Sequence, residues 1–297
     1  MNKLKIGYFA DGPWSHKALA KLLSDETLQV GFICARNDAP DNTLRAKAAE
    51  NDLDFITHPK INSPEFIDRM IHYECDLFVS MSFNQIFRKS LINLPRLGTI
   101  NCHAGKLPFY RGRNILNWVL INDEKEFGVT VHYVDEGIDT GDILVQRCYP
   151  ITDDDDYASL LERAYEECAI NLYDAIKAIH ENNVTPIAQN KIHALGLYCS
   201  ARRQGDERLD WNQSSREVFN FVRAICRPGP EARTFLGEDE IRINRVNYLP
   251  EAPNYKCIPG AVVGVERDAF FVKTLDSCIK VCEWSGYTRP RVGDRLK

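Results

Sequence analysis

Three polar residues have the types and spacing needed for a reaction in which a proton moves and an oxyanion develops. Asn101 and His103 stand two apart in the segment GTINCHAG, and Asp139 follows 36 residues after His103 in DEGIDTGD. An amide can donate to an oxyanion, an imidazole can accept a proton near neutral pH, and a carboxylate can orient that imidazole. A lone histidine is more often structural and an aspartate between glycines more often forms a turn, so the interpretation depends on the combination.

The first two of these residues are expected on one face of a strand. Residues i and i+2 of a strand point the same way, so Asn101 and His103 project together while Cys102 faces the core. Ligands of open α/β sheets bind beyond the carboxyl ends of the strands, where this pair lies. Short apolar runs with helical stretches between them predict crossover units and a mainly parallel sheet. These runs are residues 5–10, 29–35, 54–58, 76–82, 99–104 and 128–134.

Helices and a second domain are also visible in the pattern. Ser63 and Pro64 have the types of an N-cap and a first helical residue, and apolar spacing predicts a long amphipathic helix over 157–180. From about residue 200 the chain turns polar, and short β-rich segments between Pro or Gly turns predict a small barrel or sheet. We therefore expect an α/β catalytic domain over residues 1–200 and a β-rich domain over 201–297.

Composition and charge argue against several classes of protein. The 297 residues, 44% of them apolar, suffice for one large core or two ordinary ones, and no apolar stretch is long enough for a membrane helix. The formal charge of −5 gives no global attraction to nucleic acid or to an anionic membrane. The N-terminus enters a strand pattern without a signal peptide. Ten scattered cysteines without paired metal spacing favour reduced thiols in the cytoplasm and no metal site.

The string NCHAGKLPFYRG followed by EFGVTVHYVDEGIDTGDI resembles the formyltransferase family that uses N10-formyltetrahydrofolate. The family pattern is N-x-H, then L-P-x-x-R-G, then G-V-T, then D-x-G. Asn101, His103 and Asp139 match its catalytic trio in type and order. The resemblance implies a Rossmann-like, mainly parallel sheet domain followed by a small OB-like domain, which LDWNQSSREVFNFVRAICRPGP would open. It also implies N10-formyltetrahydrofolate as the formyl donor and favours a homodimer.

The resemblance implies where the folate binds as well. In the family the pteridine is held mainly by main-chain groups of the loop after the fourth strand and of the D-x-G loop. These correspond here to residues 80–87 and 134–141. Phe83 and Ile86 would suit a core position equally well. The expected folate contacts are Ser82, Phe83, Gln85, Ile86, Asp135 and Gly137.

Within the family, GKLPFYRGRNILNWVLIN is most similar to nucleotide-sugar N-formyltransferases of O-antigen and other surface-polysaccharide pathways. The tRNA enzyme usually has S-L-L-P and then A-P-I after R-G, whereas this chain has Gly105, Lys106 and RGRNILNW. Residues 200–297 carry 17 Lys and Arg against 14 Asp and Glu, a net charge of 17 − 14 = +3, without a dense basic run for a phosphate backbone. The expected acceptor is a dTDP- or GDP-linked 4-amino-4,6-dideoxyhexose. The alternative is methionyl-tRNA.

Substrate contacts are expected in two places. Arg113 and Asn114 stand where sugar-specific contacts would fall, while Arg111 belongs to the family R-G and can instead support the loop. Trp14 and His16 lie where the first strand turns into a helix. The N-terminal amides of such a helix suit a phosphate, although an ordinary helix start explains both residues equally well.

Other functions of the same sheet need motifs that this sequence lacks. The first strand ends in FADGPW, without the G-x-G-x-x-G turn of a nicotinamide-dependent dehydrogenase, and G-x-S-x-G of a serine hydrolase is absent from the sequence. A non-catalytic folate- or sugar-binding relative would use the same cleft, and the intact Asn, His and Asp set argues against it. The nucleotide, the position of the sugar amine and the oligomeric state stay open.

Overall fold

The structure is a computed structural model that describes residues 3–297, and the chain packs into two compact units. The first unit contains Met1–Gly112, Phe127–Tyr149 and Glu162–Cys199, and the second contains Arg113–Glu126, Pro150–Leu161 and Ser200–Lys297. The chain therefore passes between the units several times. The expected domain division at residue 200 stays a prediction.

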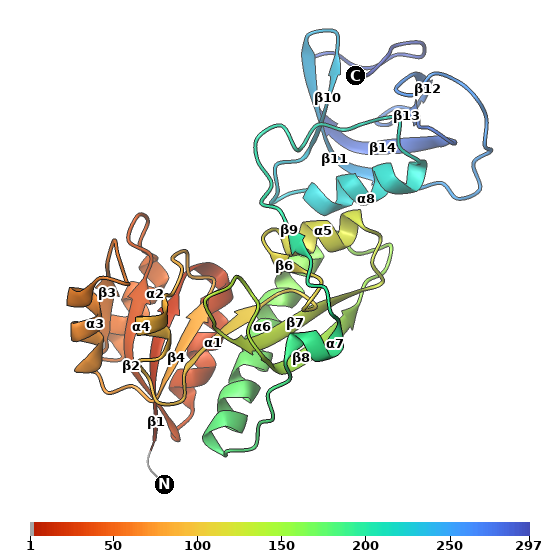
Figure 1. Ribbon diagram of the computed structural model, residues 1–297. Helices are drawn as coiled ribbons and strands as arrows, with labels where there is room; N and C mark the ends of the chain where they lie inside the picture. The colour runs from red at the N-terminus through yellow and green to blue at the C-terminus, as the bar shows by residue number, and fades with distance from the viewer. Residues whose placement is uncertain (1–2) are drawn as a thin grey trace. The chain divides into compact units, whose positions relative to one another are not determined.

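A seven-stranded sheet forms the centre of the first unit, in the order β3-β2-β1-β4-β5-β7-β8 (Figure 1). Strands β1 to β5 pair in parallel and β7 runs antiparallel to β5, so the predicted mainly parallel sheet is confirmed. The last strand, β8, is half-exposed and mixes polar with apolar residues, and its pattern gave no prediction. The bounds are β1 (Leu4–Ala10), β2 (Leu28–Ala35), β3 (Asp54–Thr57), β4 (Leu77–Met81), β5 (Thr99–His103), β7 (Glu126–Tyr133) and β8 (Ile143–Pro150).

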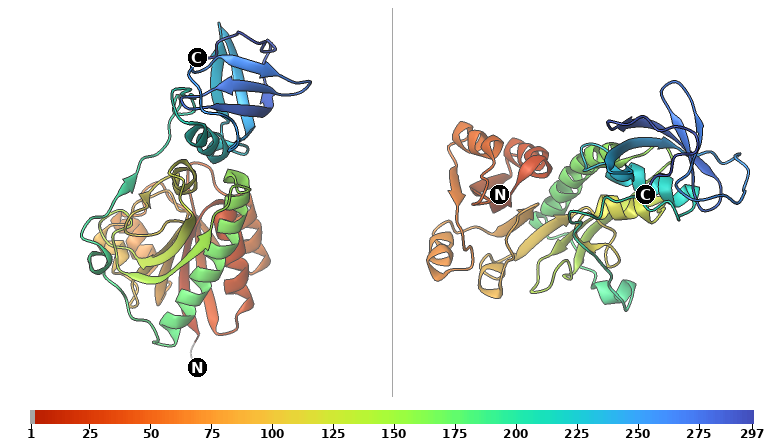
Figure 2. Two further views of the ribbon diagram at one scale, coloured as in Figure 1. Left: turned by 90° about the vertical axis from the view of Figure 1, so that its right-hand side faces the viewer. Right: turned by 90° about the horizontal axis from the view of Figure 1, so that it is seen from above.

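Helices pack along this sheet, and two of them match the sequence prediction closely. Ser63 caps α3, since its Oγ accepts from the Phe66 N–H at 3.3 Å. Helix α6 covers the predicted range and lies beside α1 (Figure 2), where Lys17 pairs with Glu166 at 2.8 Å. The bounds are α1 (Gly12–Ser24), α2 (Asn42–Glu50), α3 (Pro64–Ile71), α4 (Lys89–Ile92), α6 (Tyr157–His180) and α7 (Gln189–Ile192). None of the helices within residues 3–297 is long and apolar enough to cross a membrane.

An aromatic cluster fills part of the core of the first unit. Phe9, Phe32 and Phe78 come from three adjacent strands and are at most 1% exposed, and Phe9 meets each of the other two edge-on. Burying each such ring stabilises the fold by roughly 1.5–3 kcal/mol. Phe83 and Val134 pack against this cluster from the loops that follow β4 and β7. The core therefore supports the two loops in which folate contacts are expected.

The second unit is built on an antiparallel sheet in the order β10-β11-β14-β13-β12. Helix α8 (Ser215–Ile225) lies against it and contacts α5 (Ile115–Ile121) (Figure 1). Isolated bridges join Leu236 to Leu296 and Ala261 to Arg295, so the end of the chain links the two edge strands. This half-barrel confirms the predicted OB-like, β-rich fold. Its strands are β10 (Ala232–Leu236), β11 (Asp239–Asn247), β12 (Val262–Val265), β13 (Phe270–Lys273) and β14 (Cys278–Ser285).

Candidate active site

Strand β5 presents its polar pair as the sequence predicts. Asn101 and His103 are half-buried, whereas Cys102 is 7% exposed and its Sγ contacts the Cys168 carbonyl at 3.5 Å. In the antiparallel pairing with β7, Asn101 stands opposite His132. Directly opposed residues of such strands have their side chains on the same face. The neighbouring strand therefore adds a second imidazole to the site.

Asp139 faces both histidines. Its Oδ2 is 3.7 Å from His103 Nδ1, its Oδ1 is 3.6 Å from His132 Nε2, and Asn101 Nδ2 is 3.3 Å from the same His132 nitrogen. The structure thus brings the three predicted residues together. His132 was missed by the sequence reasoning, although its alternation with Thr130 in GVTVHYV placed it on one face of a predicted strand.

The loop that carries Asp139 is held by contacts to distant residues. Asp139 has a left-handed backbone (φ 53°), and its Oδ2 accepts from the Gly112 N–H at 2.9 Å. Gln189 Nε2 donates to the carbonyls of Asp139 and Gly141, each at 2.8 Å. Arg111 Nη2 donates to Gln189 Oε1 at 2.6 Å. Arg111 therefore supports the loop that carries Asp139 through Gln189, a residue that the sequence gave no reason to select.

The contacts of His103 identify its basic atom. Its Nε2 lies 2.6 Å from the Tyr110 carbonyl, and because a carbonyl only accepts, Nε2 carries the proton in the neutral ring. Nδ1 is then the free base, and at 3.7 Å from Asp139 it is too far for a direct hydrogen bond. A Cβ at Gly105 would lie 2.4 Å from the Tyr110 oxygen and 2.5 Å from His103 Nε2. Only glycine at position 105 allows this contact.

Burial and charge set the protonation of the pair. Burial lowers the pKa of His103, and this effect outweighs the opposing influences of the Asp139 charge and the Tyr110 carbonyl. Burial raises the pKa of Asp139, but the neighbouring His103 and His132 imidazoles and the Gly112 N–H outweigh it and bring the pKa to about 2. When both imidazoles are neutral, the hydrogen bond from the Gly112 N–H still favours the ionised carboxylate. At neutral pH the site therefore pairs a neutral imidazole with a carboxylate anion.

The first group of expected folate contacts follows β4. Ser82 has a left-handed backbone (φ 59°), and the Phe83 ring lies 5.6 Å from the Phe9 ring. Gln85 ties the loop down, since its Nε2 donates to the His58 carbonyl at 2.7 Å and its Oε1 accepts from Ile61 N–H at 3.2 Å. Ile86 is 66% exposed. Phe83 is therefore partly core and Ile86 is not.

The second group belongs to the loop after β7. Asp135 Oδ1 accepts from the Gly137 N–H at 3.0 Å and from the Thr140 hydroxyl, so these residues shape the loop around Asp139. A Cβ at Gly137 would lie 2.0 Å from Thr140 Oγ1. An exposed isoleucine and a partly buried phenylalanine beside two tight loops offer apolar surface and main-chain groups. This residue set fits a flat heteroaromatic ring such as a pteridine.

In the structure, Trp14 and His16 contact side chains of the protein itself. The Trp14 ring meets the Tyr165 ring edge-on at 4.7 Å, and His16 Nε2 lies 2.8 Å from Asp41 Oδ2. The same Asp41 oxygen accepts from the N–H of Gly12, the first residue of α1, at 3.1 Å. The Asp41 carboxylate thus lies beside the first N–H of α1, and binding of a substrate phosphate at this helix start stays a prediction. Neither residue joins the cluster around Asp139.

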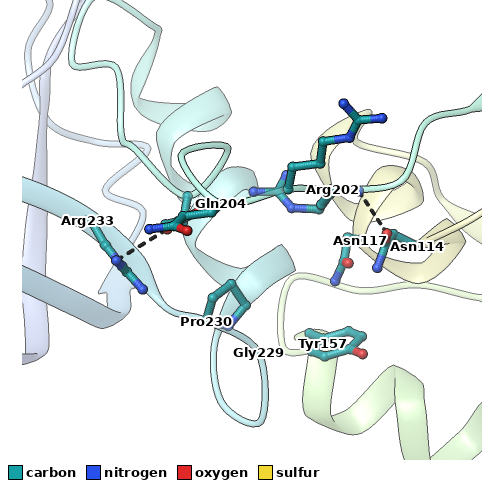
Figure 3. Close-up of a pocket in the computed structure, with 10 residues that line it drawn as sticks. Asn114, Asn117, Tyr157, Arg202, Gln204, Gly229, Pro230 and Arg233 are labelled. Carbon is teal, nitrogen blue, oxygen red and sulfur yellow. Dashed lines mark hydrogen bonds and ion pairs between the residues drawn. The ribbon is translucent and has the colours of Figure 1, made fainter. Parts of the chain in front are cut away.

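Arg113 and Asn114 belong to the second unit. Arg113 is exposed, and Asn114 has a left-handed backbone (φ 56°) just before α5. The Asn114 Oδ1 accepts from the Arg202 N–H at 2.9 Å (Figure 3). The substrate-selecting segment expected from the sequence is therefore bonded to the segment that opens the β-rich part of the chain.

Solved structures share this fold. A sugar 3N-formyl transferase, WlaRD, determined with dTDP and 5-N-formyl-THF, is 20% identical with a TM-score of 0.72 and covers 98% of this chain and 100% of its own. A 4-N formyltransferase from Francisella tularensis is 22% identical with a TM-score of 0.65 over 79% of this chain and 93% of its own. At these identities the similarity establishes the fold alone.

Sequence comparison gives nearer relatives. Methionyl-tRNA formyltransferase of Geobacter sulfurreducens is 34% identical over 77% of this chain and 70% of its own length. The enzyme of the same name from Clostridioides difficile is 28% identical over 99% and 96%. The formyl transferase family model matches residues 9–176, and the model of the formyl transferase C-terminal domain matches 202–286. The chain therefore belongs to the formyl transferase family, which uses N10-formyltetrahydrofolate as its formyl donor.

Proposed function

We propose that this enzyme transfers the formyl group of N10-formyltetrahydrofolate to the primary amine of a nucleotide-linked amino-dideoxy sugar, as in O-antigen biosynthesis. The choice of acceptor rests on one observation: several Lys and Arg side chains of the second unit pair with carboxylates of the same unit. Binding a tRNA needs Lys and Arg side chains that are free to meet phosphates. Of the 17 in residues 200–297, six pair with carboxylates of their own unit: Arg216, Arg223, Arg227, Arg233, Arg242 and Lys280.

Further features agree with a small acceptor. Lys273 is fully buried and donates to the Thr274 carbonyl, so it is not available to a phosphate backbone either. Each tRNA phosphate that the protein neutralises needs one Lys or Arg. The net charge of residues 200–297 is only 17 − 14 = +3. The departures at Gly105 and in RGRN from the tRNA-enzyme pattern support the same choice.

The proposed chemistry begins with the proton of the amine. The folate supplies an electrophilic formyl carbon; a C–N bond forms to the acceptor amine while the bond from the formyl carbon to N10 breaks. His103 Nδ1 takes the proton that the amine loses, and the same proton then leaves with N10. Asp139, 3.7 Å from Nδ1, stabilises the imidazolium while it exists.

The remaining groups act on the formyl oxygen and on each other. The Asn101 amide donates a hydrogen bond to the negative charge that develops on that oxygen. His132 Nδ1 lies 2.7 Å from the Tyr133 carbonyl and so carries a proton, which leaves Nε2 to accept from Asn101 Nδ2 at 3.3 Å. His132 thereby fixes which way the Asn101 amide points. The second N–H of the Asn101 amide is then available to donate to the oxyanion.

Methionyl-tRNA formylation is the second candidate, favoured by the relatives of that name that match nearly the whole chain. The two functions are separated by offering the purified enzyme N10-formyltetrahydrofolate with dTDP-, GDP- and UDP-linked amino sugars, and in parallel with initiator methionyl-tRNA. We expect a formylated sugar by mass spectrometry. Product from the tRNA alone would refute the proposed acceptor.

The salt dependence of KM distinguishes the two acceptors independently. A tRNA acceptor held through several phosphate contacts loses about 10³-fold or more in affinity between 50 and 200 mM salt. A nucleotide sugar carries few charges, so its KM should change far less over this range. Asn101→Ala serves as the matched control with lowered kcat, because it removes the proposed oxyanion donor and leaves the cations of the second unit unchanged.

A further inference from the structure

A polar pocket of about 370 Å³ lies within the second unit (Figure 3). Its volume falls in the lower part of the range of roughly 300–1,000 Å³ that is usual for small-molecule sites. Three arginines line it, Arg202, Arg203 and Arg233, together with one acid, Glu207. These four give a net charge of 3 − 1 = +2. None of the residues assigned above to formyl transfer, apart from the expected substrate contact Asn114, lines it.

The cationic groups of the pocket are not fully matched by acceptors. Glu207 Oε1 lies 3.3 Å from Arg233 Nη1, and its other oxygen accepts from the Gly205 N–H at 2.8 Å. The Nε of Arg233 is buried and has no hydrogen-bond partner among residues 3–297. The Arg203 side chain is exposed, and within the described residues no carboxylate pairs with it. The exposed Arg203 guanidinium is therefore available to an anion in the pocket.

Contacts with neighbouring residues of the second unit hold Arg202 and the Arg203 backbone in place. The Arg202 guanidinium lies over the rings of Trp118 and Phe221, at 5.8 and 5.4 Å from their centres, and donates to the Asp206 carbonyl. The Arg203 N–H donates to Asp206 Oδ2 at 2.7 Å, which fixes the turn between the two arginines. Such preorganisation lowers the entropy cost of binding a ligand.

We propose that this pocket binds a diphosphate group. Guanidinium forks match phosphoryl oxygens in pairs, and a diphosphate has enough acceptor oxygens for several arginines at once, which a single carboxylate does not. Two sources share this chemistry: the diphosphate of a nucleotide sugar, and that of a free nucleoside diphosphate. The first source rests on the proposed function, whereas binding of a diphosphate by the pocket does not.

The sugar-phosphate backbone of RNA would fit this arrangement less well. A nucleic-acid strand carries its charges along a line and needs cations spread over an extended surface. Here three arginines line one cavity, and Arg233 is shared with Glu207 and with Glu240 at 3.6 Å. The geometry therefore favours a compact anion.

Calorimetric titration of the full-length enzyme with inorganic pyrophosphate, and with dTDP and GDP, tests the proposal. Arg203→Gln is the diagnostic variant, because this side chain is exposed and the substitution keeps the backbone N–H that donates to Asp206. Arg208→Gln is the matched control, because it removes the same charge from the same loop while its guanidinium lies over Phe235. We expect Arg203→Gln to raise the Kd for pyrophosphate about tenfold or more and Arg208→Gln to change it by less than about twofold.

The proposal is overturned if the unaltered enzyme shows no saturable binding of pyrophosphate, or if the Kd is the same for Arg203→Gln as for the unaltered enzyme. Competition between pyrophosphate and a nucleotide sugar for binding, weakened in Arg203→Gln, supports it and identifies a nucleotide sugar as the source. Non-competitive binding that the variant weakens supports it with a free nucleotide as the source. Formyl transfer to tRNA alone, with variant-sensitive pyrophosphate binding, refutes the proposed function and leaves the pocket assignment standing.

Discussion

Replacing Asp139 by asparagine tests how much of the rate depends on its charge. The change is nearly isosteric, the amide oxygen can still accept from the Gly112 N–H, and asparagine tolerates the left-handed backbone at φ 53°. The side chains of His103 and Asp139 are 10% and 13% exposed, so little solvent screens them. At 3.7 Å and an effective dielectric constant of about 20, an imidazolium and a carboxylate attract by about 4.5 kcal/mol.

This attraction is absent while His103 is neutral and present once it holds the proton, so it lowers the barrier selectively. Losing it should reduce kcat by up to about 10³-fold, with little change in the KM of either substrate. The assay is steady-state formyl transfer with both substrates saturating, and circular dichroism and thermal unfolding serve to confirm the fold. A kcat within about threefold of the unaltered enzyme would refute the assigned role of Asp139.

Four further results are expected. Because burial lowers the pKa of His103 below 6.5, its base form is present at pH 7, and the pH profile of kcat/KM should fall only on acidification, with a midpoint below 6.5; a midpoint above 6.5 would contradict the assignment. Asn101→Ala should lower kcat about 10²–10³-fold in the same assay while folate binding, followed by fluorescence, is retained. His132→Phe should lower kcat about tenfold, since Asn101 loses the acceptor that orients it, and an unchanged kcat would leave His132 without that role. Gly105→Ala should lower kcat without abolishing folding, because its Cβ would displace the Tyr110 carbonyl from His103, and full activity would show that this contact is dispensable.

Patterns along the chain predicted those parts of the fold that depend on local spacing. The parallel strands, the Ser63 cap and the bounds of α6 follow from alternation, capping chemistry and a continuous apolar stripe. Strands β8 and β10 were not predicted, because they are short or half-exposed and lack a clear apolar alternation. These segments become strands because they pair with neighbouring strands of their sheets, and such pairing joins residues that are distant in the sequence.

The candidate site shows the same division. Asn101 and His103 were predicted together because they belong to one strand, and Asp139 was predicted from its glycine-flanked segment and from the family pattern. Gln189 lies 50 residues from Asp139 in sequence, so no local pattern links the two. His132 needed the pairing of β5 with β7 to become visible. The contact of His103 with the Tyr110 carbonyl depends on a backbone turn, which side-chain patterns do not encode.

The most direct test of the central claim is one competition measurement. The enzyme is given limiting N10-formyltetrahydrofolate with equimolar nucleotide-linked amino sugar and initiator methionyl-tRNA in the same tube, and both formylated products are quantified by mass spectrometry. The ratio of products gives the ratio of the two kcat/KM values. We predict that formylated sugar dominates and that Asp139→Asn reduces it about 10³-fold. Formylated methionyl-tRNA as the dominant product would contradict the proposed acceptor.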